Sequence, residues 1–548
     1  MAVDQWKKAL SGSFEDASKW STGTVPGTSD DARILAPGTY TVTSSISETV
    51  NSIATSSGAT LDIAGGLFQA LNGTGTGSNA GHIRVESAAT FGAGGTFKNA
   101  NALDLVGGTL QVGTSASSSL ELTGGGRVNL SGAAQIISDG SAATLTNTND
   151  IITGSGTIGD ALLVFNNAGK VIAAGGVLTL DTGTNVIQNS NALASGAGGT
   201  LDIESDVNQT AGAQVRGGAG IGVGGITNLD QITVTGGSVV ARNAGAIVNL
   251  NGATVAGALL DTTSGGIIET VAGTRSELNG ATNTGAITVV DKSALVLEGA
   301  INNTNFYSYS AISLQSTGDA TQLVIGPSNA TLTGHGTISM SANAHNEITG
   351  SSASATLTNV DNTIVGAGQL GFGHLTIDNQ SGATIEADAA PAVYSTLTID
   401  VGAGTFTNEG TLKVDDSGIM DVKSNVSGGG KANLLGTSTL EFEKASDQQV
   451  TFGADNELLA LDNASSFSGT VAGLDSHSDT IDLKNIDFTA AGFAMNFVSS
   501  AGGGDLSITD GSQTATVHLL GDFSAGTFAA SADTGVGTNI TFNHPAVV

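Results

Sequence analysis

Gly58-Ala59-Thr60-Leu61-Asp62-Ile63 is one copy of a short pattern that returns along the whole chain and decides the fold. A glycine suited to a turn precedes Leu or Ile alternating with polar residues, which is the period of a half-buried β-strand. Repetition of such a strand-and-turn unit predicts a stack of coils. Further copies are Gly108-Thr109-Leu110-Gln111-Val112, Gly199-Thr200-Leu201-Asp202-Ile203 and Gly382-Ala383-Thr384-Ile385-Glu386.

A longer repeat lies over this short one. Ala143-Thr144-Leu145-Thr146-Asn147, followed by a glycine-rich block at 154–159, returns 212 residues later as Ala355-Thr356-Leu357-Thr358-Asn359 with the block at 366–371. A third, shorter copy occupies residues 330–338. Because the offset is kept through both blocks, the repeats are expected to be successive coils of one architecture.

Composition supports an all-β fold of this kind. The chain has 548 residues with 80 Gly, 5 Pro, no Cys and 12% charged residues. So much glycine is costly unless most of it lies at corners. We therefore predict a β-solenoid (β-helix) of roughly twenty coils, each of ~20–25 residues in two or three short strands.

Three regions are predicted along the chain. Residues 1–40 contain both Trp residues, Trp6 and Trp20, and are expected to form an N-terminal cap that covers the free strand edge of the first coil. Residues 41–435 are the solenoid repeats. Residues 436–548 hold nine of the 17 Phe residues, which predicts a C-terminal β cap or small β domain with a thicker core.

Charge and hydropathy argue against two classes of partner. The net charge is −31, and the 17 Lys and Arg residues form no basic cluster, so no nucleic-acid partner is expected. The sequence contains no apolar run of about 18 residues, so no membrane insertion is expected either. The lack of cysteine fits an oxidising exterior.

The N-terminal decapeptide 1–10 has no apolar segment of the kind found in secretory signal peptides. A cytosolic location, or prior removal of a leader, would explain this. We favour leaderless export to the cell surface or beyond, because the tail from Phe523 to Val548 is free of Lys and Arg and ends in small and apolar residues.

A resemblance to a known family rests on several motifs taken in order. Leu357-Thr358-Asn359-Val360-Asp361-Asn362-Thr363-Ile364, Leu397-Thr398-Ile399-Asp400 and Asn408-Glu409-Gly410-Thr411-Leu412 resemble repeat blocks of large, type I-secreted surface proteins of alphaproteobacteria. The opening at 20–32 and the ending at 438–483 are similar to the start and the closing module of those proteins. The resemblance implies an adhesin-like or matrix β-solenoid at the cell exterior.

Three stretches match G-x-G-x-x-G, beginning at Gly154, Gly220 and Gly366. A dinucleotide site requires a strand before this motif and a helix after it, whereas strand-like sequence follows here, so we interpret these glycines as turn residues. A polysaccharide lyase or hydrolase is the enzymatic alternative, but residues 128–274 contain only three fixed cations for acidic glycans. We therefore predict that the protein is not an enzyme.

Acidic residues gather at two places that suit calcium, whose ligands are oxygens. The alternatives are a calcium site without the usual nonapeptide repeat and a solvated acidic rim, and no other cofactor is expected. The candidate ligands are Asp202, Glu204, Asp206, Asp475, Asp479 and Asp482.

These features favour an extracellular structural protein that assembles with itself, as a filament, surface-layer or biofilm-matrix subunit or as an adhesin stalk. A glycan- or host-surface-binding adhesin, with a surface polysaccharide as partner, is the second hypothesis, and a lyase is the third. Aromatic surface near both termini would favour a head-to-tail contact between copies. The residues expected at that contact are Trp6, Trp20, Phe523, Phe528 and Phe542.

Overall fold

The computed structural model describes residues 2–219, 224–304, 311–388, 396–474 and 478–543. The fold is all-β, with 59% of residues in strands and 1% in helix. It is a β-solenoid of about 20 turns, which confirms the predicted fold class and number of coils. The chain divides into two compact units, unit 1 (Met1–Glu269) and unit 2 (Thr270–Val548), and each is described by itself.

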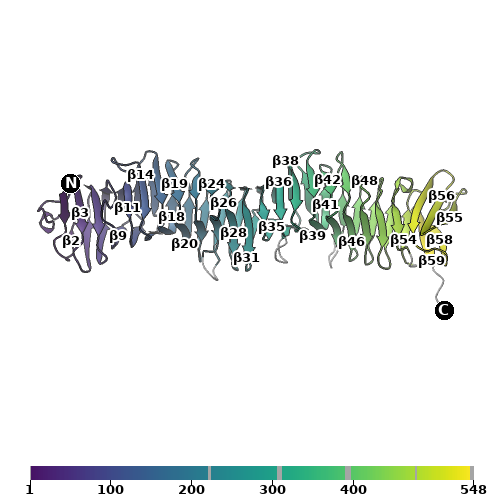
Figure 1. Cartoon of the computed structure of the whole chain (residues 1–548), viewed down its shortest axis with the longest axis horizontal. Coiled ribbons are helices and arrows are strands. Elements are labelled where there is room, and N and C mark those ends of the chain that lie inside the picture. Colours follow the sequence, from purple (N-terminus) through teal and green to yellow (C-terminus); the bar gives the residue numbers. More distant parts are fainter. Residues whose placement is uncertain (1, 220–223, 305–310, 389–395, 475–477, 544–548) are drawn as a thin grey trace. The chain divides into compact units, whose positions relative to one another are not determined.

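A typical turn of unit 1 contains three short strands. Each strand pairs in parallel with its counterpart in the next turn, as Figure 1 shows for successive arrows along this unit. Equivalent residues lie 20 to 25 positions apart, as for Asn79 and Asn99 or Thr96 and Glu121. The strands of two such turns are β9 (His82–Val85), β10 (Ala89–Ala93) and β11 (Gly95–Lys98), then β12 (Ala102–Val106), β13 (Thr109–Val112) and β14 (Ser119–Thr123).

Parallel, in-register stacking converts the alternating sequence pattern into continuous apolar columns. Every second side chain of a strand points inward and meets the equivalent side chain of the next turn. In unit 1 one fully buried column consists of Val42, Leu61, Ile83, Leu103, Val128, Ile152, Val171, Leu193, Val215, Val239 and Leu260. In unit 2 a buried column consists of Leu295, Leu323, Ile348, Leu370, Ile399, Val422, Phe442, Leu461 and Leu483.

The first turn of unit 1 begins with two short strands and one short helix. β1 (Ala2–Gln5) pairs with β3 (Asp30–Ile34), and β2 (Gly12–Ser13) pairs with β4 (Tyr40–Ser44), all in parallel. The 3-10 helix η1 (Ala17–Lys19) follows β2. The backbone N–H of Lys7 donates to the Lys19 carbonyl, so the end of η1 lies against the segment after β1.

The last turns of unit 2 change from parallel to antiparallel pairing. After β53 (Thr470–Ala472) and β54 (Thr480–Leu483), the chain forms hairpins that pair with these two strands. Figure 1 shows these closing strands at the C-terminal end of unit 2. They are β55 (Ala494–Ser500), β56 (Gly503–Thr509), β57 (Thr514–Leu520), β58 (Thr527–Ala532) and β59 (Thr538–Asn543).

The G-x-G-x-x-G glycines at 154 and 366 lie in bent strands and precede no helix. Gly154 is in β18 (Ile151–Ile158) with φ +126°, and Gly366 is in β41 (Thr363–Gly371) with φ +124°. Both φ values lie where residues with a Cβ are strained. The glycines therefore shape bends of the solenoid. Gly220, at the start of the third match, lies outside the described residues.

Candidate functional site

The two indoles proposed for assembly are core residues of the first turn. Trp6 is 2% exposed and Trp20 is fully buried. Their rings meet edge to face at 5.2 Å, and Phe14 packs against Trp20 at 4.9 Å. The indole N–H of Trp6 donates to the Leu10 carbonyl, and that of Trp20 to the Phe14 carbonyl, so both buried donors are satisfied. The expectation that these indoles present apolar surface to a second copy is therefore corrected.

The Phe residues of the closing hairpins form a cluster that reaches the surface. Phe542 is buried, while Phe523, Phe528 and Phe497 are half-buried around it. Phe523 and Phe528 each lie 5.0 Å from Phe542 between ring centroids, and Phe497 lies 4.9 Å from Phe528. The structure thus brings the three predicted residues together and adds Phe497, which lies in the same Phe-rich region of the sequence.

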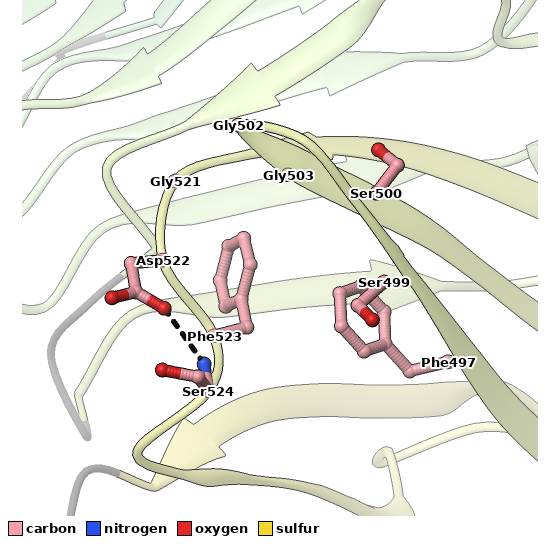
Figure 2. A pocket seen from close by; sticks show the side chains of 9 residues that line it. All are labelled: Phe497, Ser499, Ser500, Gly502, Gly503, Gly521, Asp522, Phe523 and Ser524. Atoms are coloured by element: carbon pink, nitrogen blue, oxygen red, sulfur yellow. Dashed lines mark hydrogen bonds between the residues drawn. The ribbon is translucent and has the colours of Figure 1, made fainter.

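A hollow of about 570 Å³ opens beside this cluster. Figure 2 shows the rings of Phe497 and Phe523 facing it from two different segments, with Asp522 at its rim. One Asp522 carboxylate oxygen accepts from the backbone N–H of Ser524 at 3.0 Å. The hollow therefore combines aromatic surface with serine hydroxyls and a carboxylate; its polar lining includes Ser499, Ser500 and Ser524.

Two strands next to the hollow are sheet edges. Among the described residues, β55 pairs only with β56, and β58 pairs only with β59. An edge strand carries backbone N–H and C=O groups that face away from its own sheet and can pair with another strand. Val498 of β55 is 59% exposed, so apolar side-chain surface accompanies this edge.

The structure disperses the first group of predicted calcium ligands. Asp202 accepts from the Asn228 side chain at 2.6 Å, and Asp206 accepts from the Thr233 backbone N–H at 2.7 Å. The pKa of Glu204 is raised by the partial burial of its carboxyl group. The negative charges of Asp181, Asp230 and Asp202 raise it further. Among the described residues, these carboxylates form no group of three or more that is arranged to hold a metal ion.

The second group of predicted ligands is deeper in unit 2. Asp479 is buried, with one oxygen accepting from the Glu457 backbone N–H at 3.2 Å, and Asp482 is 9% exposed. Burial raises the pKa of Asp482 to about 6, with the charge of Asp533 adding to the shift. Asp475 lies outside the described residues. Across the described ranges, no group of three or more His, Cys, Asp or Glu side chains is arranged to hold a metal ion.

Near the end of unit 2, two lysines form ion pairs with several of the surrounding carboxylates. Lys423 pairs with Asp421 at 3.2 Å and with Glu443 at 3.0 Å. Farther along the unit, Lys484 pairs with Glu441 and, at 3.2 Å, with Asp462. The ion pairs of Lys423 with Glu443 and of Lys484 with Glu441 and Asp462 connect different turns and tie them to one another.

Sequence reasoning missed a ladder of buried amide side chains inside unit 1. The Nδ2 of Asn79 donates to Asn99 at 2.9 Å, and the Nδ2 of Asn99 donates to Asp150 at 3.0 Å. Each amide also satisfies backbone groups at a corner, as Asn79 does for the Ala102 carbonyl at 2.8 Å. The ladder continues through Asn147, Asn167, Asn189 and Gln209 with distances of 2.9, 3.0 and 3.1 Å.

Unit 2 contains a ladder of the same kind. Buried Asn283 donates to Asn303 at 2.9 Å, and Asn303 donates to Asn362 at 3.0 Å. In the sequence these residues stand at the end of strand patterns such as Leu357-Thr358-Asn359, a position that is equally typical of an exposed turn. The ladder continues through Asn359, Asn379, Asn408 and Gln448 with distances of 3.0, 2.7 and 2.6 Å.

Comparison with known proteins gives no family for this chain. No protein-family model matches it, and a search of curated proteins finds no significant match. In the part of the chain that the structure describes, no helix has the length and apolar character needed to cross a membrane.

Proposed function

We propose that this protein is a structural component of the cell exterior, where it assembles with itself as a filament, surface-layer or matrix subunit or forms an adhesin stalk. The observation that carries the proposal is the internal amide ladder of each unit. Every rung binds its neighbours through buried hydrogen bonds, so successive turns are held together from Asn79 to Gln209 in unit 1 and from Asn283 to Gln448 in unit 2. Such a framework suits a load-bearing or spacing role.

The surface supports the same role. Lys423 and Lys484 bridge acids of successive turns, and the net charge of −31 disfavours nonspecific clumping of copies. At the same time, β55 and β58 offer strand edges at which ordered association can take place. A surface that is repulsive along its length and adhesive at defined edges favours regular assembly over aggregation.

Two measurements test this proposal. Antibody raised against the purified protein should label intact cells of the producing organism without permeabilisation. Negative-stain microscopy of the purified protein should show regular multimers whose abundance rises with protein concentration. Labelling only after permeabilisation would contradict the external location, and monodisperse single particles at every concentration would contradict self-assembly.

Binding of a neutral glycan is a second candidate function, and the aromatic hollow favours it. Sugar rings stack on aromatic faces, and Phe497 and Phe523 present such faces next to serine hydroxyls. Affinity electrophoresis with neutral polysaccharides tests this candidate. Phe523→Ala should then abolish retardation, while Phe488→Ala, at a half-buried Phe packed on Phe493, should not. Retardation that is equal in both variants would contradict a site in the hollow.

We propose no enzymatic role. In unit 1, partial burial lowers the pKa of Arg216, and the positive charge of Arg242 lowers it further, while Arg242 lies 3.8 Å from Asp261. A lyase for acidic glycans would use cations on neighbouring turns that are free to meet substrate carboxylates, but Arg216 is partly buried and Arg242 already faces the carboxylate of Asp261. Incubation with acidic polysaccharides should therefore yield no ultraviolet-absorbing unsaturated products, and their release would overturn this part of the proposal.

A further inference from the structure

The edge strand β55 lacks the features that normally protect a sheet edge. Its seven residues, Ala-Met-Asn-Phe-Val-Ser-Ser, include no charged side chain and no proline. Its partner among the described residues is β56 alone, and Val498 is 59% exposed. Natural proteins usually block such an edge with Lys, Pro or a covering segment. An unblocked edge of this length is therefore suited to pairing with a strand from another molecule.

The surroundings of this edge are acidic. After Lys484 the sequence contains no Lys or Arg, but it contains five Asp residues. Asp505 stands directly opposite Val498 on β56 and contacts the imidazole of His518 at 2.7 Å. Asp522 lies at the rim of the aromatic hollow (Figure 2). Two copies of this surface would repel each other, so the charge selects a basic partner.

The first turn of unit 1 offers that complement. Lys7 and Lys8 are the only adjacent pair of basic residues in the sequence, and both are exposed. They follow β1, which pairs only with β3 among the described strands. Val3 of β1 is 43% exposed, and Leu10, just after the lysines, is 57% exposed. This turn therefore combines an open strand edge, apolar side chains and positive charge.

Acids of the same turn do not cancel this character. Asp4 is buried, and its carboxylate accepts from the Ser21 hydroxyl at 2.8 Å and from the Thr22 hydroxyl at 2.7 Å. Glu15 accepts from the Ser45 backbone N–H at 2.8 Å, and Asp16 accepts from the Ser18 backbone N–H at 3.0 Å. These carboxylates are engaged within the turn, whereas the Lys8 side chain is exposed to solvent.

Resting on the self-assembly part of the proposed function, we propose that the first turn of unit 1 in one copy docks on the closing hairpins of unit 2 in a second copy. The edge of β1 pairs with the edge of β55, and Leu10 covers the Phe497–Phe523 hollow. Lys7 and Lys8 meet Asp505 and Asp522. Because the two surfaces differ, the contact is heterologous and continues from copy to copy.

Charge reversal tests the proposal with the full chain. The head variant is Lys7→Glu with Lys8→Glu, and the tail variant is Asp505→Lys with Asp522→Lys. Sedimentation velocity over a concentration series should show association at least tenfold weaker for each variant alone. An equimolar mixture should regain association, since the Glu head of one variant meets the Lys tail of the other, and the Lys head of the second meets the Asp tail of the first.

A control variant separates this contact from the effect of net charge. Lys98→Glu with Lys431→Glu makes the same change in net charge as the head variant at exposed lysines elsewhere, and should associate like the wild type. Association that is unchanged in head and tail variants, or not regained on mixing, would overturn this inference while leaving self-assembly in place. A wild-type chain that stays monomeric would overturn the proposed function itself, and this inference with it.

The strand edge is tested separately from the charges. Val498→Asp places a carboxylate on the β55 edge and should weaken association at least tenfold, while Val177→Asp, at a 49% exposed position of β20 (Lys170–Leu180), should not. Far-ultraviolet circular dichroism confirms that both variants are folded. Equal association of these two variants would overturn the role assigned to β55.

Discussion

Residues 143–167 of unit 1 and residues 355–379 of unit 2 are two copies of one sequence block, and their comparison separates what the repeat requires from what it tolerates. Both copies form a short strand, a glycine-bent strand and another short strand. These are β17 (Ala143–Asn147), β18 and β19 (Leu163–Asn167) in unit 1, and β40 (Thr356–Asn359), β41 and β42 (Thr376–Asn379) in unit 2. The bends at Gly154 and Gly366 agree to within a few degrees of φ.

One buried position differs in charge. Asp150 of unit 1 accepts from the Asn99 amide at 3.0 Å and from two backbone N–H groups, those of Gly125 at 2.9 Å and Gly126 at 3.2 Å. Its counterpart Asn362 accepts from the Asn303 amide at 3.0 Å and donates to Asp361 at 3.2 Å. The ladder therefore requires an acceptor at this position, while the charge is decided by how many further donors converge there.

The largest effect is expected from the glycines that both copies share. A Cβ on Gly154 would lie 1.9 Å from the Leu130 carbonyl oxygen, and one on Gly366 would lie 2.1 Å from that of Met340. Gly154→Ala and Gly366→Ala should each reduce stability by about 4 kcal/mol, through left-handed strain plus overpacking. Urea unfolding followed by circular dichroism measures this loss.

Gly175→Ala is the matched control for backbone strain alone. Gly175 has φ +67°, and no atom lies within 4 Å of the position that a Cβ would take there, so the loss should be only about 1 kcal/mol. A loss at Gly154 no larger than at Gly175 would show that the close approach of the turns is unimportant. Unequal losses of stability at Gly154 and Gly366 would contradict the conclusion that the two glycines have the same role in the two copies.

The next effect comes from the amide ladder. Asn167→Leu removes the acceptor for Asn147 and the donor to Asn189, and Asn379→Leu does the same between Asn359 and Asn408. Leaving these buried partners without hydrogen bonds should cost about 3 kcal/mol in each copy. Hydrogen exchange resolved by turn is the measurement, because repeat proteins open locally.

Asn166→Leu is the control for the ladder, since Asn166 precedes Asn167 but faces outward and is half-exposed. This substitution should change the protection of neighbouring amides little, by less than about 0.5 kcal/mol. A ladder variant that behaves like Asn166→Leu would mean that the buried amides contribute packing and not hydrogen bonding.

The bend glycines and the ladder amides also differ in how well the sequence alone predicts them. Turn glycines and alternating Leu and Ile positions could be read from the sequence, because their backbone and burial requirements are local. The ladder could not, because Asn at the end of a strand is equally typical of an exposed turn. The prediction for Trp6 and Trp20 was wrong for a similar reason: the sequence shows apolar residues near the N-terminus but not that Phe14 and the Leu10 carbonyl enclose them.

The closing hairpins show the same limit at the candidate site. The abundance of Phe after residue 436 predicted a C-terminal β cap or small β domain with a thicker core, and in this region the rings of Phe523 and Phe528 pack on Phe542. Among the described residues, β55 is an edge strand because β54 pairs with β59 and not with β55. This long-range pairing cannot be predicted from a local sequence pattern. The hollow beside Phe497 follows from that pairing.

Exchanging the residues at the position that differs, Asp150 and Asn362, tests how the charge affects the stability of each copy. Asn362→Asp places a carboxylate beside Asp361 without the two backbone donors available to Asp150, and should cost about 2 kcal/mol near neutral pH. Asp150→Asn keeps an acceptor but turns an N–H toward the Asn99 amide, and should cost about 1 kcal/mol. Urea unfolding of both variants measures the difference, and a larger loss for Asp150→Asn would reverse the explanation given for the charge.

The smallest expected effect is a pH dependence of stability that is confined to residues 143–167, the copy that contains Asp150. Burial raises the pKa of Asp150 from 3.8 to about 6, against hydrogen bonds from Asn99, Gly125 and Gly126 that lower it. Between pH 3.8 and about pH 6, the Asp150 carboxyl keeps its proton in the folded unit but has released it in the unfolded chain. The free energy of unfolding therefore falls as the pH rises through this range, and it levels off once the folded-state carboxyl has ionised as well. From about pH 5 to about pH 7.5 the loss should be about 1 kcal/mol.

The two copies give this pH effect its internal control. Amide protection, corrected for the intrinsic exchange rate, should fall over that pH range at residues 143–167 but stay level at residues 355–379, where Asn362 does not titrate. Asp150→Asn should remove the fall in unit 1, and Asn362→Asp should introduce one in unit 2. Asp482, whose pKa is also raised to about 6, acts at the last turns of unit 2, so it is read separately at β54 and β59. An equal fall in both copies of the wild-type chain would mean that Asp150 is not its source, and that the charge at this rung has no effect on the stability of unit 1.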